Sequence, residues 1–127
     1  MHYYYCDTCA VINLYKANDL IKLSKYKDNF HIADLQLEYE LLYPDGIKEL
    51  TRNSITVDIT TMDILNIANQ IMEKHRPLSK FDALALSFSI TKEYVLITDD
   101  IKLQKACKEY DVHYITTREI VEIFIEK

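Results

Sequence analysis

Residues 94–100 read YVLITDD, a continuous apolar run that ends in a hydroxyl and two carboxylates. Helical patterns lie on both sides of this run, which is typical of a buried strand in a parallel sheet covered on both faces. In parallel sheets, functional side chains gather just beyond the carboxyl ends of the strands. Asp99 and Asp100 therefore lie where such a fold presents its chemistry.

The rest of the chain repeats this alternation of strand and helix. Short aromatic or β-branched runs predict further strands at residues 3–6, 30–33, 55–57 (an edge strand) and 112–115. Apolar spacing of three and four residues predicts helices between them. Their predicted starts are Thr8, Asp19, Asp34, Gly46, Thr60 or Thr61, Ser79, Asp100 and Thr117. The helix after Asp34 is expected to carry Leu37, Leu41 and Leu42, and the one after Gly46 to end near Leu50.

This order predicts a three-layer α/β/α sandwich with a central, mostly parallel sheet of roughly four or five strands. The chain has 127 residues, 49% of them hydrophobic, which suits one domain spanning residues 1–127. We find no linker, repeat or low-complexity segment.

Composition excludes several function classes. With one Gly, the chain cannot form a glycine-rich phosphate loop. Its net charge of −5 argues against a general polycationic surface for nucleic acid, although a local basic rim remains compatible with it. No stretch approaches the roughly 20 apolar residues that span a bilayer, and no signal peptide is recognisable. We expect a cytoplasmic protein with reduced cysteines.

Cys6 and Cys9 form a C-x-x-C pair. We interpret them as two small buried side chains flanking the end of a strand; a redox pair or half of a metal site are the alternatives. The four histidines show no spacing that indicates covalent catalysis.

Asp7, Asp82 and Asp100 are the acids that the predicted fold brings together. Asp7 follows the first strand, and Asp82 lies in the first turn of an otherwise apolar helix. Each taken alone is also compatible with a helix cap or a turn. Clustered carboxylates repel one another, and a hard cation such as Mg²⁺ removes that penalty.

Three segments carry a family resemblance. YCDT at residues 5–8, LSKFDALAL at 78–86 and LITDDIKL at 96–103 resemble, in order and spacing, the PIN-domain nucleases. The resemblance covers essentially the whole chain. It implies a metal-binding role for Asp7, with Thr8 beside it, and a PIN-like fold.

The resemblance also assigns the other site residues. Asp82 would be the third acid, Asp100 the last, and Thr98 the hydroxyl two residues before it, while Asp99 would be a solvated turn residue. The second acid is Glu40, with Glu38 as the competitor; the two lie about 200° apart on a helix, so only one can face the site.

Two features of the chain depart from the family pattern. Cys9 stands where the family often has a small polar residue, and the acidic balance is unusual for a nuclease. A basic rim to bind phosphates is still available from Arg76, Lys80, Lys92, Lys102 and Lys105.

The implied activity is a metal-dependent endoribonuclease that uses Mg²⁺ or Mn²⁺. A metal-activated water would cleave single-stranded RNA and leave a 5′-phosphate and a 3′-hydroxyl. The small size is similar to that of the toxin of a prokaryotic toxin–antitoxin pair, which implies an antitoxin partner and a homodimer. The alternatives are a non-catalytic PIN-like interaction module, a phosphorylatable receiver domain and a redox protein.

Overall fold

The computed structural model describes residues 2–126, which form five strands and eight helical segments. The strands are β1 (Tyr4–Cys6), β2 (Phe30–Ala33), β3 (Thr56–Asp58), β4 (Val95–Ile97) and β5 (Tyr114–Ile115). The helical segments are α1 (Thr8–Lys16), the 3₁₀ segment η1 (Leu20–Asn29), α2 (Asp34–Glu40), α3 (Ile47–Ser54), α4 (Met62–Lys74), α5 (Lys80–Lys92), α6 (Ile101–Glu109) and α7 (Thr117–Phe124).

All five strands are parallel, in the order β3-β2-β1-β4-β5. The chain builds the sheet outward from β1 to β3 and then returns to place β4 on the other side of β1. The order therefore reverses between β1 and β4, and in sheets of this kind ligands bind beyond the carboxyl ends of the strands at such a reversal. Asp7 follows β1 and Thr98 follows β4, so both lie at this point.

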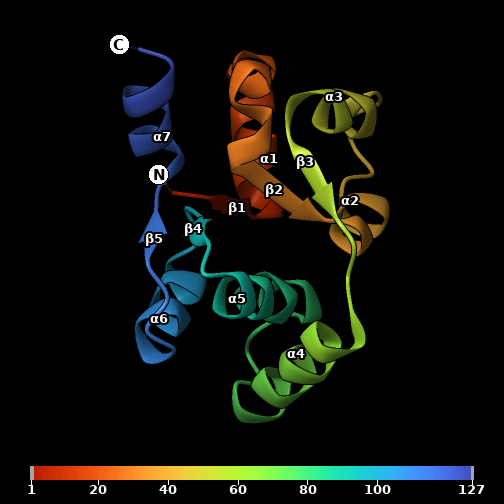
Figure 1. Cartoon of the computed structure of the whole chain (residues 1–127), viewed down its shortest axis with the longest axis vertical. Coiled ribbons are helices and arrows are strands. Elements are labelled where there is room, and N and C mark those ends of the chain that lie inside the picture. The colour runs from red at the N-terminus through yellow and green to blue at the C-terminus, as the bar shows by residue number, and fades with distance from the viewer. Residues whose placement is uncertain (1, 127) are drawn as a thin grey trace.

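Helices cover both faces of the sheet, which makes the predicted three-layer architecture correct (Figure 1). In that view α4, α5 and α6 lie below the sheet, and α1, α3 and α7 lie above it. The middle helix of the lower layer, α5, packs against β1, β2 and β4. The segment from Ala83 to Ser89 is buried on all sides, as its lack of a polar face indicated.

The structure corrects several predicted boundaries. α2 ends at Glu40, leaving Leu41 buried and Leu42 exposed, because Pro44 disfavours helical backbone in the residue before it and cannot donate a hydrogen bond. The next helix, α3, runs on past Leu50 to Ser54. The predicted buried run forms β4, which begins at Val95 and is an interior strand beside the central β1.

Two predicted local roles also change. Asp34 is the first residue of α2 rather than its N-cap, and its carboxylate accepts hydrogen bonds from the backbone and hydroxyl of Thr60. Cys9 is exposed on α1, whereas Cys6 is fully buried in β1. Only half of the expected buried pair is therefore buried, and the thiols of Cys6, Cys9 and Cys107 are all free.

Candidate functional site

Asp7 is a nearly buried carboxylate at the carboxyl end of β1, with 4% of its surface exposed. Its backbone N–H donates to Ile97 in β4 (3.1 Å), which fixes it between the two strands. Its Oδ2 accepts a hydrogen bond from Thr98 (3.1 Å). Burial above all, and then the nearby charges of Asp82 and Glu40, raise the pKa of Asp7 to about 7.

Thr98 joins the ends of β1 and β4 through one hydroxyl. Besides donating to Asp7, its Oγ1 accepts the backbone N–H of Asp100 (3.1 Å). Asp100 is the N-cap of α6, where its Oδ1 accepts the N–H of Lys102 (2.9 Å). The hydroxyl thus connects two of the predicted site acids, in a position that is fully buried.

Asp99 has a structural role instead of being the solvated turn residue that we expected. Its carboxylate accepts hydrogen bonds from the backbone and hydroxyl of Thr117, at 2.9 and 2.6 Å, and from the amide of Asn13 at 2.8 Å. Burial alone would raise its pKa, but these hydrogen bonds hold the pKa of Asp99 below its ordinary value. Asp99 ties the start of α7 to α1.

The two glutamates of α2 face different neighbours. Glu40 accepts a hydrogen bond from the Thr8 hydroxyl (2.5 Å), beside Asp7. Glu38 is exposed and forms ion pairs with Arg52 and Lys48 of α3. The geometry therefore places Glu40, and not Glu38, on the side of the acids.

Asp82 has both a capping contact and a position near the other acids. Its Oδ2 accepts the backbone N–H of Ser79 (3.1 Å) while the Ser79 hydroxyl accepts the N–H of Asp82, a capping box at the start of α5. The ammonium of Lys102 lies 3.9 Å away. Because Lys102 belongs to α6, this contact places Asp82 beside the helix that Asp100 caps. After burial, the negative charge of Asp82 also contributes to the raised pKa of Asp7.

Cys9, in the first turn of α1, is affected by the charges of the four predicted acids. Partial burial raises the pKa of its thiol first, and four carboxylates raise it further: Asp7, Asp100, Asp82 and Glu40. Effects of this kind weaken with distance, so all four acids contribute to the electrostatic environment of this thiol. They come from four separate segments of the chain.

The donor set suits a hard divalent cation, because it consists of carboxylate and hydroxyl oxygens. Within residues 2–126, however, no group of three His, Cys, Asp or Glu side chains is arranged closely enough to hold an ion. Glu40, Asp82 and Asp100 each keep a hydrogen bond of their own. The chemistry of the site therefore fits a metal, and binding one requires these side chains to turn toward a common point.

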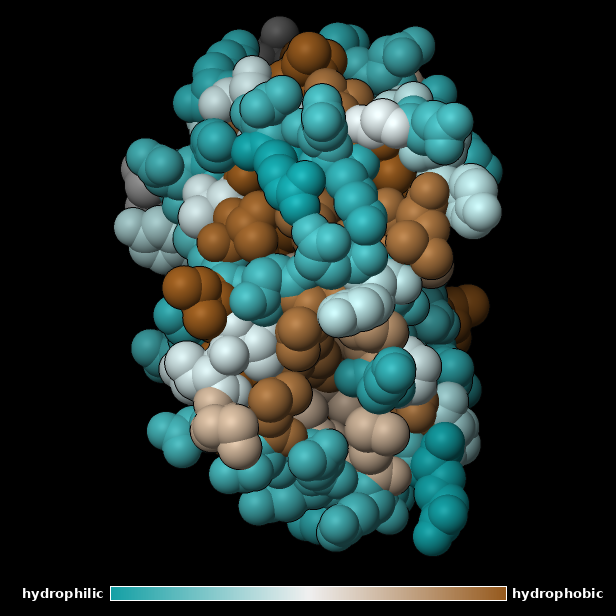
Figure 2. All heavy atoms as spheres, turned by 90° about the vertical axis from the view of Figure 1, so that its right-hand side faces the viewer, coloured by the Kyte–Doolittle hydropathy of each residue, from teal (hydrophilic) through white to brown (hydrophobic). Residues whose placement is uncertain are grey.

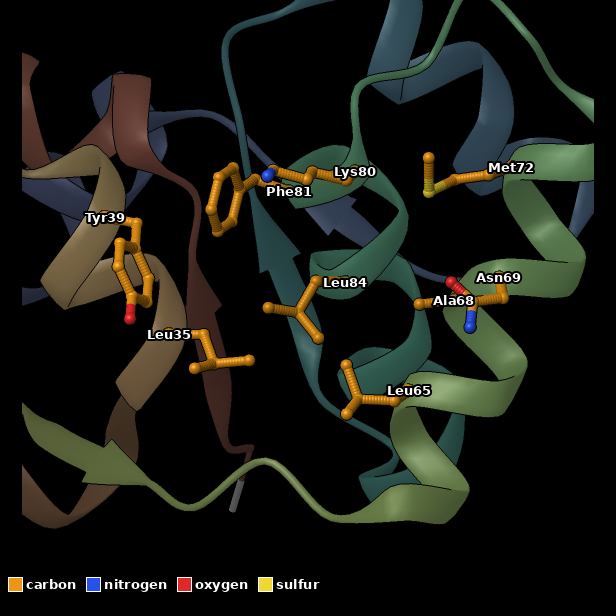
Figure 3. Close-up of a pocket in the computed structure, with 9 residues that line it drawn as sticks. All are labelled: Leu35, Tyr39, Leu65, Ala68, Asn69, Met72, Lys80, Phe81 and Leu84. Carbon is orange, nitrogen blue, oxygen red and sulfur yellow. The ribbon is translucent and has the colours of Figure 1, made fainter.

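An apolar groove runs beside the acids between α2, α4 and α5. It has a volume of about 520 Å³ and is lined mainly by apolar and aromatic side chains. Figure 3 shows Tyr39 and Leu35 of α2 on one wall, Leu65 and Met72 of α4 on the other, and Phe81 between them. Tyr39 precedes Glu40 and Phe81 precedes Asp82, so the groove adjoins the site. On the face shown in Figure 2, apolar side chains gather across the middle of the molecule.

Of the five predicted rim residues, two have contacts that place them at the acids or the groove. Lys102 lies near Asp82, and the Lys80 ammonium lies over the ring of Phe81, 5.4 Å from its centre. Lys92 is exposed at the end of α5. Arg76 and Lys105 are exposed.

Sequence reasoning missed one residue of this cluster, Gln36. Its carboxamide lies fully buried between Asp7, Thr8 and Glu40. The spacing of the sequence could have identified Gln36. It lies four residues before Glu40, and residues four apart share a helix face.

Comparisons with known proteins were made at the level of sequence and of structure. Neither a scan against family models nor a search of curated proteins finds a match. Solved structures do match over nearly the whole chain. PAE2754 from Pyrobaculum aerophilum is 18% identical, with a TM-score of 0.70 over 99% of this chain and 98% of that one.

A PilT N-terminus domain protein from the archaeon Sulfolobus solfataricus is 15% identical, with a TM-score of 0.63 over 98% of this chain and 95% of that one. The chain has the PilT N-terminus (PIN) domain fold. A third match is a chain of VapBC2 from Rickettsia felis, in a structure of VapBC2 bound to a DNA fragment from its promoter. It is 13% identical, with a TM-score of 0.61 over 89% of this chain and 97% of that one. The predicted resemblance is thus confirmed in the fold. Across residues 2–126 of this PIN fold, no helix is long and apolar enough to cross a membrane.

Proposed function

We propose that this chain is a single-domain, metal-dependent endoribonuclease that cleaves single-stranded RNA, with Asp7, Glu40, Asp82 and Asp100 as the metal-binding acids. The observation that carries the proposal is the hydrogen-bond network at the carboxyl end of the sheet. It joins Asp7 to Glu40 through Gln36 and to Asp100 through Thr98, and Lys102 links Asp82 to the same helix start. Such a concentration of negative charge destabilises the fold unless a cation offsets it. The PIN fold of the compared structures supports the same reading.

A bound Mg²⁺ or Mn²⁺ would lower the pKa of a water and stabilise the oxygen that leaves phosphorus, giving a 5′-phosphate and a 3′-hydroxyl. The chain's own residues prepare the site. Thr98 holds the Asp7 carboxylate by hydrogen bonding to Oδ2, and Thr8 holds Glu40. Lys102, next to Asp82, supplies a positive charge for an RNA phosphate.

We further propose a protein partner of the antitoxin type and a homodimer. The VapBC2 complex among the compared structures supports the partner. The groove of Figure 3 offers it an apolar surface that includes Tyr39 and Phe81, the chain neighbours of Glu40 and Asp82. A partner seated there would cover the site and block RNA from it.

A non-catalytic interaction module is the second candidate. It is favoured by the capping contacts of Asp82 and Asp100 and by the fact that, among residues 2–126, no three potential ligands are arranged to hold an ion. In that case the acids would serve the helix ends, and the groove would be the functional surface.

The deciding experiment is cleavage of a mixed-sequence single-stranded RNA in Mn²⁺ and in excess chelator. We expect cutting in Mn²⁺ only, its loss in Asp100→Asn, and its retention in Asp99→Asn. Asp99 is the matched control, since it is the adjacent carboxylate and bonds to Thr117 and Asn13 instead of the site. Cutting that resists chelator, or equal effects of the two substitutions, would contradict the metal mechanism. If neither the wild type nor a variant cuts RNA, the non-catalytic interaction module is the function that stands.

A further inference from the structure

Gln36 is a fully buried polar side chain in the first turns of α2. A buried carboxamide is unfavourable unless its oxygen and both N–H groups find partners. All of the partners of Gln36 belong to the site or to the strand beneath it. They are Tyr5 of β1, Asp7, Thr8 and Glu40.

The orientation of this amide is fixed from two sides. The Tyr5 hydroxyl accepts the backbone N–H of Ala33 (3.2 Å), and it donates its single proton to Oε1 of Gln36. On the other side, ionised carboxylates can only accept hydrogen bonds, so the amide must turn Nε2 toward them. Both requirements give the same orientation.

Nε2 then serves three acceptors with its two protons. It lies 2.7 Å from the Thr8 hydroxyl, 3.3 Å from Oε1 of Glu40 and 3.4 Å from Oδ1 of Asp7. Because Thr8 accepts from Gln36, its own proton is free to go to Glu40 (2.5 Å). The hydrogen bonds therefore run in one direction, from the Ala33 N–H through Tyr5, Gln36 and Thr8 to the Glu40 carboxylate.

This arrangement brings N–H and O–H donors to two repelling carboxylates without adding a charge. A Lys or Arg at this position would neutralise the acids and compete with a cation for them. A Glu would remove both N–H groups and add a further negative charge. A neutral donor of this length holds Oδ1 of Asp7 and Oε1 of Glu40 together, while Thr98 contacts the other oxygen of Asp7.

We propose that Gln36 is a positioning residue of the site, which sets the separation and orientation of Asp7 and Glu40 for the cation. The inference rests on the proposed metal-dependent function. It assigns Gln36 an indirect role, through the two acids, of the kind that hydrogen-bond partners of metal ligands have in other proteins.

The test is Gln36→Met, which keeps the length of the side chain and removes all of its hydrogen bonds. The matched control is Thr51→Val, which removes a buried hydrogen bond to Ile47 in α3 on the other side of α2. We expect Gln36→Met to weaken Mn²⁺ binding about tenfold or more by calorimetry, because outer partners of ligands are worth about 10–100-fold. We also expect kcat to fall at saturating Mn²⁺ with the KM for RNA unchanged. Thr51→Val should leave the Mn²⁺ affinity, kcat and KM at their wild-type values.

Gln36→Glu is the second variant, to be used if Gln36→Met fails to fold. It keeps a side-chain oxygen that can accept from the Tyr5 hydroxyl. We expect it to bind Mn²⁺ more tightly while kcat falls, because the added charge attracts the ion but the N–H donor shared by Asp7 and Glu40 is lost. If a folded Gln36 variant matches the wild type in Mn²⁺ affinity and kcat, the positioning role is wrong and the proposed function stands. If the wild type neither binds Mn²⁺ nor cuts RNA, the proposed function itself has failed.

Discussion

At the scale of single residues, Asp7 is a site carboxylate that is almost completely buried. Both burial and the charge of Asp82 oppose its ionisation. A pKa raised to about 7 means that the folded protein binds a proton there more readily than the unfolded chain does. Without metal, the ionised form lowers the stability of the fold at neutral pH.

This predicts a pH dependence with a definite sign. In chelator, the destabilisation by ionised Asp7 is fully present above pH 7 and fades as the pH falls toward the ordinary value of 3.8. Relative to Asp7→Asn, the wild type should gain about 2–3 kcal/mol of unfolding free energy between pH 8 and pH 5. Urea unfolding at the two pH values measures this gain. If the unfolding free energy depends on pH equally in both proteins, the pKa of Asp7 is not raised in the fold.

A second prediction separates the two glutamates of α2. Because Glu40 bonds to Thr8 while Glu38 pairs with Arg52, Glu40→Gln should reduce RNA cleavage at least about a hundredfold. Glu38→Gln should leave most of the activity and cost at most about 1 kcal/mol of stability, as expected of an exposed ion pair. Initial rates in Mn²⁺ test both; a larger loss in Glu38→Gln would contradict the placement of α2.

At the scale of elements, the start of α5 combines a structural and a proposed functional role in Asp82. Ser79 was predicted as the N-cap from sequence, and the capping box is formed. From sequence, a helix cap and a metal ligand were alternative interpretations of Asp82. In the structure its carboxylate caps α5, and its charge also contributes to the raised pKa of Asp7. One oxygen suffices for the cap, so the two roles are compatible.

The two roles can be separated by substitution. Ser79→Ala removes the hydroxyl acceptor and should lower the unfolding free energy by about 1 kcal/mol while leaving cleavage intact. Asp82→Asn keeps an oxygen for the Ser79 N–H, so it should cost less stability in chelator yet abolish cleavage. Melting curves in chelator and rates in Mn²⁺ check both. A stability loss in Asp82→Asn as large as that in Ser79→Ala, with cleavage retained, would make Asp82 a cap alone.

The predictable parts of the fold are those that depend on local pattern. Strand ends follow from apolar runs, so Asp7, Thr98 and Asp100 could be placed at one edge of the sheet. The end of α2 was misplaced because the apolar stripe through Leu42 continues past the true stop. Gln36 was missed because polar residues usually mark a helix surface, and its burial comes from Tyr5, far away in sequence.

At the scale of the whole molecule, the PIN fold is kept at 13–18% identity to the compared structures. The net charge of −5 gives this version little general attraction for RNA. Of the predicted basic rim, only Lys80 and Lys102 have contacts at the groove or the acids. RNA binding should therefore depend on few phosphate contacts.

The salt dependence of the KM for RNA measures the number of phosphate contacts. With two phosphates neutralised, the logarithm of 1/KM for single-stranded RNA should fall against the logarithm of salt concentration with a slope of about −1.4. Rates at fixed Mn²⁺ over a range of KCl concentrations give the slope, and Lys102→Gln should make it shallower. A slope several times steeper would reveal a basic track elsewhere on the surface.

The exposed thiol of Cys9 also makes the site accessible to a simple spectroscopic assay. Cys6 and Cys107 are buried, so a chromogenic aromatic disulfide should label only Cys9 until the protein unfolds. Partial burial, and after it the four acids, raise the pKa of Cys9, which keeps its thiolate fraction low and slows labelling. Mn²⁺ that neutralises them should speed the reaction in the wild type but much less in Asp7→Asn. The rate of colour formation would then report ion binding without RNA; equal rates with and without Mn²⁺ would place the ion away from this thiol.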